Sequence, residues 1–197
     1  MFVDADAFYT LDPADAETKA TPRTVGILPV HLYGQPVDLG AVQDLASRLG
    51  LWLLEDCAQA QGAEWKGRRV GSFGRAAVFS FYPSKNLPGM GDGGAVLTSD
   101  DEVMARCRRL RDHGRIDRDV HAEIGFNLRY NELQAAALRV LLRRLDAMND
   151  RRRLSPSATR AGSPGSRSSC RRSARTPGTC TTSSSCARPG ARRWRAS

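Results

Sequence analysis

Residues 76–98, AAVFSFYPSKNLPGMGDGGAVLT, decide the fold of this chain. The run 76–82 is apolar, β-branched and aromatic, which predicts a buried strand. Lys85 follows at the exit of that strand, and four glycines between 89 and 94 turn the backbone into a second apolar strand over 95–98. A lysine held by rigid strands and glycine turns suits imine chemistry, because a partly desolvated amine loses its proton more readily. The alternative is an ordinary surface lysine in a hairpin.

Upstream of this stretch, the pattern predicts a strand, a helix and a second strand. Thr24–Val30 is a short apolar strand, and Asp38 can cap a helix over 39–49 that Gly50 ends. Leu51–Leu54 is the next strand, with Asp56 just beyond its carboxyl end. This spacing is typical of a βαβ unit, so the fold class is α/β with a mostly parallel sheet flanked by helices. Ligands bind beyond the carboxyl ends of such strands, where Asp56 lies.

The remaining patterned segments are shorter or more polar. Residues 12–22 are turn-rich, and the connection 57–75 is expected to contain a hairpin that turns at Lys66-Gly67. Ser99 to Glu102 has the sequence of a capping box that opens a helix ending near 113. A polar loop is expected over 115–130. Asn131 can cap a final long helix, whose apolar positions are Leu133, Ala137, Val140, Leu141, Leu145 and Met148.

Charge divides the chain into two parts, which we expect to be a partial large domain over 1–153 and a tail over 154–197. The net charge of +9 comes from the tail: residues 1–150 carry 18 basic and 21 acidic side chains, whereas the rest carries 12 arginines and no acid. The tail lacks the apolar surface needed to offset chain entropy, so disorder is expected. Because helical periodicity stops abruptly, translation of the tail out of frame is a second hypothesis. Nucleic-acid binding would need basic residues on a folded face, and the first 150 residues offer none.

Composition also bears on the cellular compartment expected for the chain. No stretch approaches the roughly 20 apolar residues of a membrane span, and no signal peptide is visible. Only Cys57 and Cys107 lie in the patterned part, so a disulfide framework is not expected there and a reducing cytoplasm is the default.

Five motifs taken together resemble one protein family. They are PVHLYG (29–34), EDCAQA (55–60), FSFYPSKN (79–86), GDGGA (91–95) and GFNLRYNELQA (125–135). In this order and spacing they resemble the DegT/DnrJ/StrS-type sugar aminotransferases, which have PLP-transferase fold type I and depend on pyridoxal 5′-phosphate (PLP). The resemblance covers roughly residues 2–153.

The resemblance implies a role for five residues. Lys85 matches the lysine that bonds covalently to PLP and shuttles protons, and Asp56 matches the acid that pairs with the pyridinium nitrogen, whose pKa a carboxylate raises. Gln59 matches a residue beside the cofactor ring, and Ser80 a hydroxyl that binds the phosphate. Asn127 matches an asparagine that reaches the phosphate in a neighbouring subunit, which implies a homodimer. Apart from Lys85, each has an ordinary alternative when taken singly: Asp56 a strand-end cap, Gln59 an exposed loop residue, Ser80 a core hydroxyl and Asn127 a turn residue.

The chain also departs from the family pattern. Gln61 stands where many relatives have histidine, and Arg75 where an acid is common. The family's opening region, with a phosphate-binding loop and a stacking aromatic residue, is not matched, and the arginine-rich tail replaces the small domain. The expectation is therefore a central piece of an aminotransferase large domain.

The resemblance implies transfer of an amino group from L-glutamate to a keto sugar nucleotide for amino-sugar biosynthesis. The residues around Lys85 and in the GDGGA motif resemble those of relatives that act on 3-keto dTDP-sugars more than those of relatives that act on 4-keto dTDP-sugars. Three alternatives remain. The first is a PLP-dependent sugar dehydratase, which Lys85 disfavours because such enzymes replace this lysine with histidine. The second is an inactive fragment with exposed strand edges. The third is a nucleic-acid binder driven by the arginine tail.

Overall fold

The computed structural model describes residues 1–161, with side chains described to residue 154. The strands are β1 (Gly26–Ile27), β2 (Trp52–Asp56), β3 (Glu64–Trp65), β4 (Arg68–Arg69), β5 (Ala76–Ser80), β6 (Gly94–Thr98), β7 (Arg115–Asp117) and β8 (Val120–His121). The helices are α1 (Pro13–Lys19), α2 (Leu39–Leu49), α3 (Asp101–Leu110), α4 (Glu132–Leu142) and α5 (Leu145–Ala161), with a 3-10 turn at Leu32–Gly34. No helix within residues 1–161 combines the length and the apolar character that a membrane span needs.

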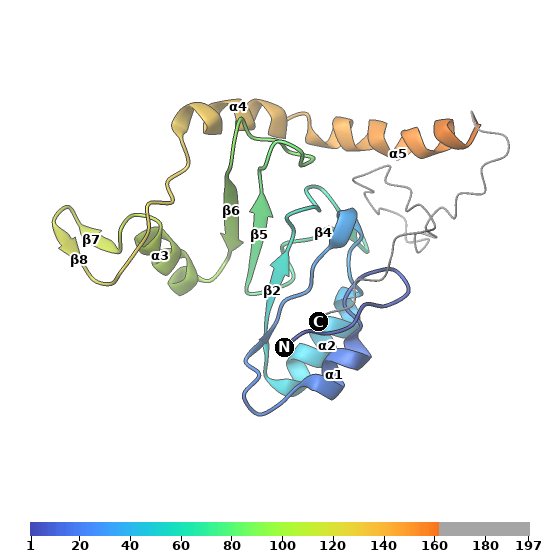
Figure 1. Ribbon diagram of the computed structural model, residues 1–197, viewed down its shortest axis with the longest axis horizontal. Helices are drawn as coiled ribbons and strands as arrows, with labels where there is room; N and C mark the ends of the chain where they lie inside the picture. The colour runs from blue at the N-terminus through green and yellow to red at the C-terminus, as the bar shows by residue number, and fades with distance from the viewer. Residues whose placement is uncertain (162–197) are drawn as a thin grey trace, which may run out of the picture.

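The central sheet has the order β1-β2-β5-β6. β1, β2 and β5 run parallel, while β6 returns antiparallel to β5, so the sheet is mostly parallel as predicted. Asp56 is in register with Val78, which places the carboxyl ends of β2 and β5 side by side. Figure 1 shows α4 and α5 lying across this end of the sheet, with α1 and α2 at the opposite end.

Helix α2 forms as the sequence predicts. The carboxylate of Asp38 accepts hydrogen bonds from the amides of Gly40 and Ala41, and Gly50 ends the helix in the left-handed conformation. Leu39, Val42, Leu45 and Ala46 are buried at helical spacing and join Leu53 and Ala77 of the sheet in one core cluster. This core holds β2 and β5, and therefore fixes where their carboxyl ends lie.

The structure corrects three predictions: one strand, one helix cap and one segment expected to be turn-rich. The strand over Thr24–Val30 is reduced to Gly26–Ile27 and one further bridge from Val30 to Asp56, because Pro29 between them has no amide to donate. Asp100, not Ser99, caps α3, since its carboxylate accepts from the amides of Glu102 and Val103. The polar segment 12–22 contains α1, which Asp12 caps and Pro13 opens.

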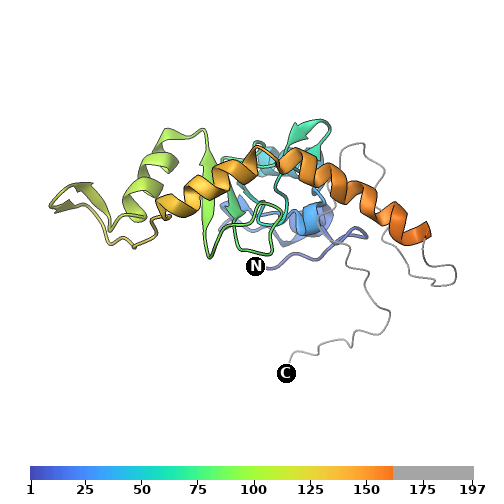
Figure 2. The same ribbon diagram turned by 90° about the horizontal axis from the view of Figure 1, so that it is seen from above.

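The last part of the chain also differs from the prediction. The hairpin β7–β8 lies within the segment 115–130, which was expected to be a polar loop. Earlier in the chain, the predicted hairpin turn at Lys66-Gly67 is confirmed. The single helix expected from Asn131 divides at residues 143–144 into α4 and α5, which lie nearly end to end (Figure 2). α5 runs past the boundary expected after residue 153. The tail over 162–197 lies outside the described residues.

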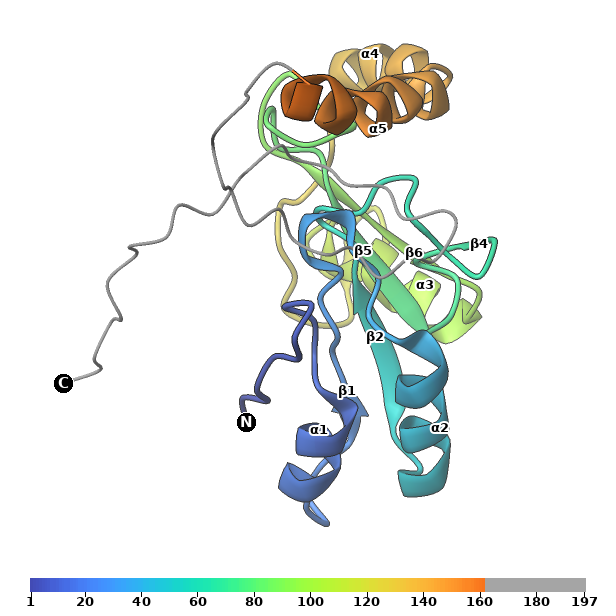
Figure 3. The ribbon, with the colours of Figure 1, turned by 90° about the vertical axis from the view of Figure 1, so that its right-hand side faces the viewer.

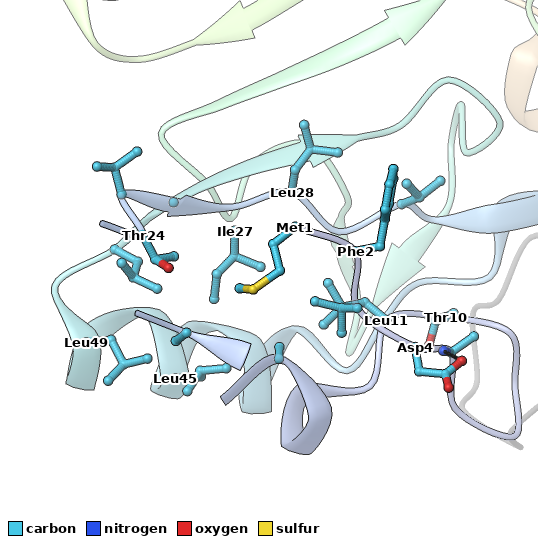
Figure 4. Close-up of a pocket in the computed structure, with 18 of the residues that line it drawn as sticks. Met1, Phe2, Asp4, Thr10, Leu11, Thr24, Ile27, Leu28, Leu45 and Leu49 are labelled. Atoms are coloured by element: carbon cyan, nitrogen blue, oxygen red, sulfur yellow. Dashed lines mark hydrogen bonds between the residues drawn. The ribbon is translucent and has the colours of Figure 1, made fainter. Parts of the chain in front are cut away.

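The outer edges of the sheet are open within residues 1–161. β1 pairs with β2 alone and β6 with β5 alone. Beside β1, an apolar pocket of about 860 Å³ opens between the first residues of the chain, α1 and α2, where Figures 3 and 4 show them close together. Its apolar lining includes Phe2, Leu11, Ile27, Leu45 and Leu49. None of the predicted cofactor residues lines this pocket, so it is not the predicted cofactor site.

Candidate active site

Two of the predicted site residues lie at adjacent strand ends. Asp56 is the last residue of β2 and Ser80 the last of β5, and the register places Asp56 opposite Val78, two positions before Ser80. Neighbouring strands run about 4.8 Å apart, so both side chains belong to the same end of the sheet. The amide of Ala58 donates to Oδ1 of Asp56 at 2.9 Å, and among the described residues no hydrogen bond engages Oδ2. One carboxylate oxygen therefore remains available for a partner.

The loop after β2 carries Gln59 and Gln61, which lie three and five residues beyond Asp56. Oε1 of Gln59 accepts from the amide of Tyr33 at 2.9 Å, which ties this loop to the turn after β1. Nε2 of Gln61 donates to the carbonyl of Ser80 at 2.6 Å and to that of Ala58 at 3.2 Å. Oε1 of Gln61 is buried and has no hydrogen-bond partner among the side chains and backbone that the structure describes. An unpartnered buried acceptor beside Ser80 indicates a position where a donor from outside the described chain could bind.

Lys85 lies in the tight turn that follows β5. Its amide donates to the carbonyl of Tyr82 at 2.9 Å, and the amide of Gly89 donates to the carbonyl of Phe81 at 2.6 Å. The next two residues, Asn86 and Leu87, are buried, whereas Lys85 is half-buried. The turn is therefore closed by backbone hydrogen bonds and held by the buried residues that follow the lysine.

Asn127 is not brought to this end of the sheet by hydrogen bonds within the described residues. Its backbone pairs with Asp112, just after α3, and its side chain is exposed and accepts a long hydrogen bond from Nε of Arg129 at 3.4 Å. Phe126 and Leu128 on either side are 59% and 68% exposed. Asn127 therefore sits on an exposed, partly apolar segment.

A buried acid beside Asp56 holds the surrounding backbone. Glu55 is fully buried, and its carboxylate accepts hydrogen bonds from the amides of Gly71, Phe73 and Gly74. It also lies 3.1 Å from Nε2 of His31, whose Nδ1 accepts from the amide of Val37. Burial alone would raise the pKa of Glu55, but these hydrogen bonds together hold it below the ordinary value.

The same acid belongs to a buried group with the composition of a metal site. His31, Glu55 and Cys57 offer ligand atoms within 4.8 Å of one another. Both ring nitrogens of His31 already have partners, and Glu55 is engaged by three amides. Burial raises the pKa of the Cys57 thiol, so the thiolate that a metal needs is disfavoured. We interpret this group as a hydrogen-bond network that positions the backbone behind Asp56.

The chain is similar in sequence and structure to proteins of one family. The model of the DegT/DnrJ/EryC1/StrS aminotransferase family matches residues 1–160, and the chain belongs to this PLP-dependent family. Among curated proteins, it is 56% identical over 144 residues to the erythromycin biosynthesis sensory transduction protein EryC1 of Saccharopolyspora erythraea. It is 52% identical over 143 residues to the dTDP-3-amino-3,4,6-trideoxy-alpha-D-glucose transaminase of Streptomyces venezuelae.

The match to these relatives is partial in length. Each alignment covers 73% of this chain but only 39% and 38% of the two relatives, respectively, so the chain spans about two fifths of their length. Among solved structures, S. venezuelae DesV in complex with a ketimine intermediate superposes with a TM-score of 0.77 at 48% identity, covering 83% of this chain and 45% of that one. The fold predicted from the resemblance, part of a fold type I large domain, is thereby confirmed.

The residues at the strand ends fit PLP in their chemistry. Lys85 offers an amine, Asp56 a carboxylate oxygen without a described partner and Ser80 a hydroxyl, which are the groups that an aldehyde, a ring nitrogen and a phosphate require. The orphaned Oε1 of Gln61 lies within the same group. Lys85, Asp56 and Ser80 are the residues that would hold the aldehyde carbon, the ring nitrogen and the phosphate of PLP.

Two buried amides at this site were not predicted from the sequence. Asn86 and Asn149 are 5% and 1% exposed, and Nδ2 of Asn86 donates to Oδ1 of Asn149 at 2.9 Å. One signal could have indicated Asn149: it lies four residues after the buried Leu145, so an amide occupies the apolar face of the helix. A polar residue in that position usually has a buried partner.

Proposed function

We propose that this chain carries the cofactor-binding centre of a PLP-dependent aminotransferase that transfers an amino group from L-glutamate to a keto sugar nucleotide, with a 3-keto dTDP-sugar as the acceptor. The observation that carries the proposal is the gathering of Asp56, Ser80 and the Lys85 turn at adjacent carboxyl ends of β2 and β5. The similarity to a dTDP-amino-sugar transaminase supports the choice of acceptor.

Each residue has a task in this proposal. PLP supplies an electron sink that stabilises negative charge on the carbon from which a proton is removed. Lys85 would hold the cofactor through Nζ and, as a free amine during transfer, would accept and return the migrating proton. Asp56 keeps a proton on the ring nitrogen through Oδ2. Ser80 binds the phosphate through Oγ, and Gln59 orients the ring from the loop that it anchors to Tyr33.

We further propose a homodimer in the cytoplasm. Asn127 lies on an exposed segment with apolar neighbours, which suits a residue that reaches the phosphate of a partner subunit. Both cysteines of the described part are free thiols, consistent with a reducing compartment.

The test uses the fact that the chain has only three lysines, Lys19, Lys66 and Lys85. The purified chain is mixed with PLP, its visible absorption is recorded, and the adduct is reduced with borohydride and mapped by mass spectrometry. We expect a visible band and a reduced adduct on Lys85 alone, with both lost in Lys85→Ala and retained in Lys66→Ala. An adduct distributed over all three lysines would contradict the proposal. Addition of L-glutamate should then bleach the band.

An inactive fragment is the second candidate, and the open edges favour it. β1 and β6 each have an unpaired edge within residues 1–161, and the apolar pocket beside β1 is open to solvent. Absence of a visible band in both the wild-type chain and Lys85→Ala would support this candidate. Residues 1–161 give no such support to a dehydratase, and the arginine tail invoked for a nucleic-acid binder lies largely outside the described residues.

A further inference from the structure

Three buried amide side chains connect the segments that carry the proposed cofactor residues. Gln61 reaches the carbonyl of Ser80 from the loop after Asp56, and Asn149 of α5 donates through Nδ2 to the backbone carbonyl of Gln61 at 2.9 Å. Asn86, next to Lys85, donates to Oδ1 of Asn149. All three side chains are at least 95% buried. We call Gln61, Asn86 and Asn149 the amide chain.

We infer that Asn149 is a positioning residue of the proposed site, which fixes the turn carrying Lys85 against the loop that follows Asp56. The expected effect on PLP binding rests on the proposed function, whereas the positions of the segments rest on the observed hydrogen bonds. Asn149 contacts both sides: its Nδ2 donates to the loop and its Oδ1 accepts from the turn. The two partners are 88 and 63 residues away in sequence, so α5 adds a long-range link between the segments that follow β2 and β5.

The backbone is shaped to admit this side chain. Gly62 follows Gln61 with a φ of +84°, and a Cβ there would lie 2.6 Å from Nδ2 of Asn149, so only glycine leaves room for the amide. Leu145, one turn earlier on α5, is buried beside the same glycine. The approach of α5 is therefore set by packing and by a glycine, and the amide then meets both partners with good geometry.

The burial explains why the connection should be rigid. Leaving a buried amide without a partner costs more free energy than one hydrogen bond contributes to stability. Each hydrogen bond of the amide chain is therefore costly to break. The turn itself has backbone hydrogen bonds that close it, but these do not attach it to the loop after β2. Loss of Asn149 should therefore let the turn open more often and shift relative to Asp56, which would misplace the Lys85 amine.

The experiment compares Asn149→Ala with Asp146→Ala. Asp146 lies on the same helix and pairs with Arg69 of β4 at 2.9 Å, so its loss weakens the attachment of α5 without touching the amide chain. Asn149→Leu, of similar volume, is a second variant should the alanine variant fail to fold. Hydrogen exchange of residues 81–89 is measured on the full chain without PLP, and the apparent Kd for PLP and the pH at which the visible band titrates are measured afterwards.

We expect exchange in residues 81–89 to accelerate by about tenfold in both Asn149 variants and to stay within about twofold of wild type in Asp146→Ala. The Kd for PLP should rise by about tenfold, and the titration of the band should shift, in the Asn149 variants alone. Equal behaviour of the Asn149 and Asp146 variants in exchange would overturn the inference. If the wild-type chain forms no band, the proposed function fails, while the exchange measurement still decides on the amide chain.

Discussion

Helices α2 and α4 have the same length and the same kind of cap but very different surroundings. Both span 11 residues, and each begins at a side chain, Asp38 or Asn131, whose oxygen accepts from two backbone amides. α2 buries four residues against the sheet, whereas α4 buries none. Leu133 and Val140, predicted to face inward, are 82% and 56% exposed. Local sequence thus forms both helices, but full burial requires close packing against a core, and the described residues provide this only for α2.

The largest expected effect is a difference in the free energy of unfolding between one leucine variant in each of these two helices. Leu45 of α2 is 1% exposed, so Leu45→Ala should lower the free energy of unfolding by about 3 kcal/mol through lost burial and the cavity left behind. Leu133→Ala on α4 should change it by less than about 0.5 kcal/mol. Urea denaturation of both variants measures the difference. A large loss in Leu133→Ala would show that another surface covers α4 in solution.

The second prediction concerns the buried acid behind Asp56. Glu55→Gln should lower the free energy of unfolding at pH 7 by about 2 kcal/mol, because one amide oxygen replaces a carboxylate that serves three amides and His31. The pKa of Glu55 is held below its ordinary value in the folded chain, so its contribution is present above that ordinary value. The contribution is lost as pH falls through the folded pKa.

The matched control for this acid is an exposed one. Glu17 pairs with Arg48 at the surface, and Glu17→Gln should have little effect on unfolding at any pH. Denaturation curves at pH 7 and pH 3 should show that the wild type loses more stability on acidification than Glu55→Gln does. The same acid loss in both chains would show that Glu55 is not the group responsible.

The smallest expected effect compares a thiol of the core with one outside it. Cys57 is fully buried, and burial raises its pKa, whereas Cys107 on α3 is half-buried. Under native conditions iodoacetamide should label Cys107 before Cys57, and peptide mapping by mass spectrometry will resolve the two. In denaturant the difference should vanish. Labelling of Cys57 at the rate of Cys107 in the native chain would indicate that the core around β2 opens readily.

Much of the fold could be predicted because its signals are local. The strand 76–80, the return strand, the caps at Asp38 and Asn131 and the turn at Lys66-Gly67 each depend on residues within a few positions of one another. The cap of α3 was misassigned by one residue because serine and aspartate compete for the same amides and the carboxylate accepts more strongly. The strand over 24–30 was overestimated because apolar content hid the missing amide of Pro29.

The sequence by itself determined the α/β class, the family and the order of the strands whose ends carry Asp56 and Ser80. Only the tertiary structure decided that Asn149 lies between Gln61 and Asn86, that no residue of α4 is fully buried by the described chain and that Asn127 bonds to none of the strand-end residues within it. The physical reason is the sequence separation of the interacting residues. Caps and turns are completed by neighbours in sequence, whereas a buried amide finds its partner only after packing has brought distant segments together.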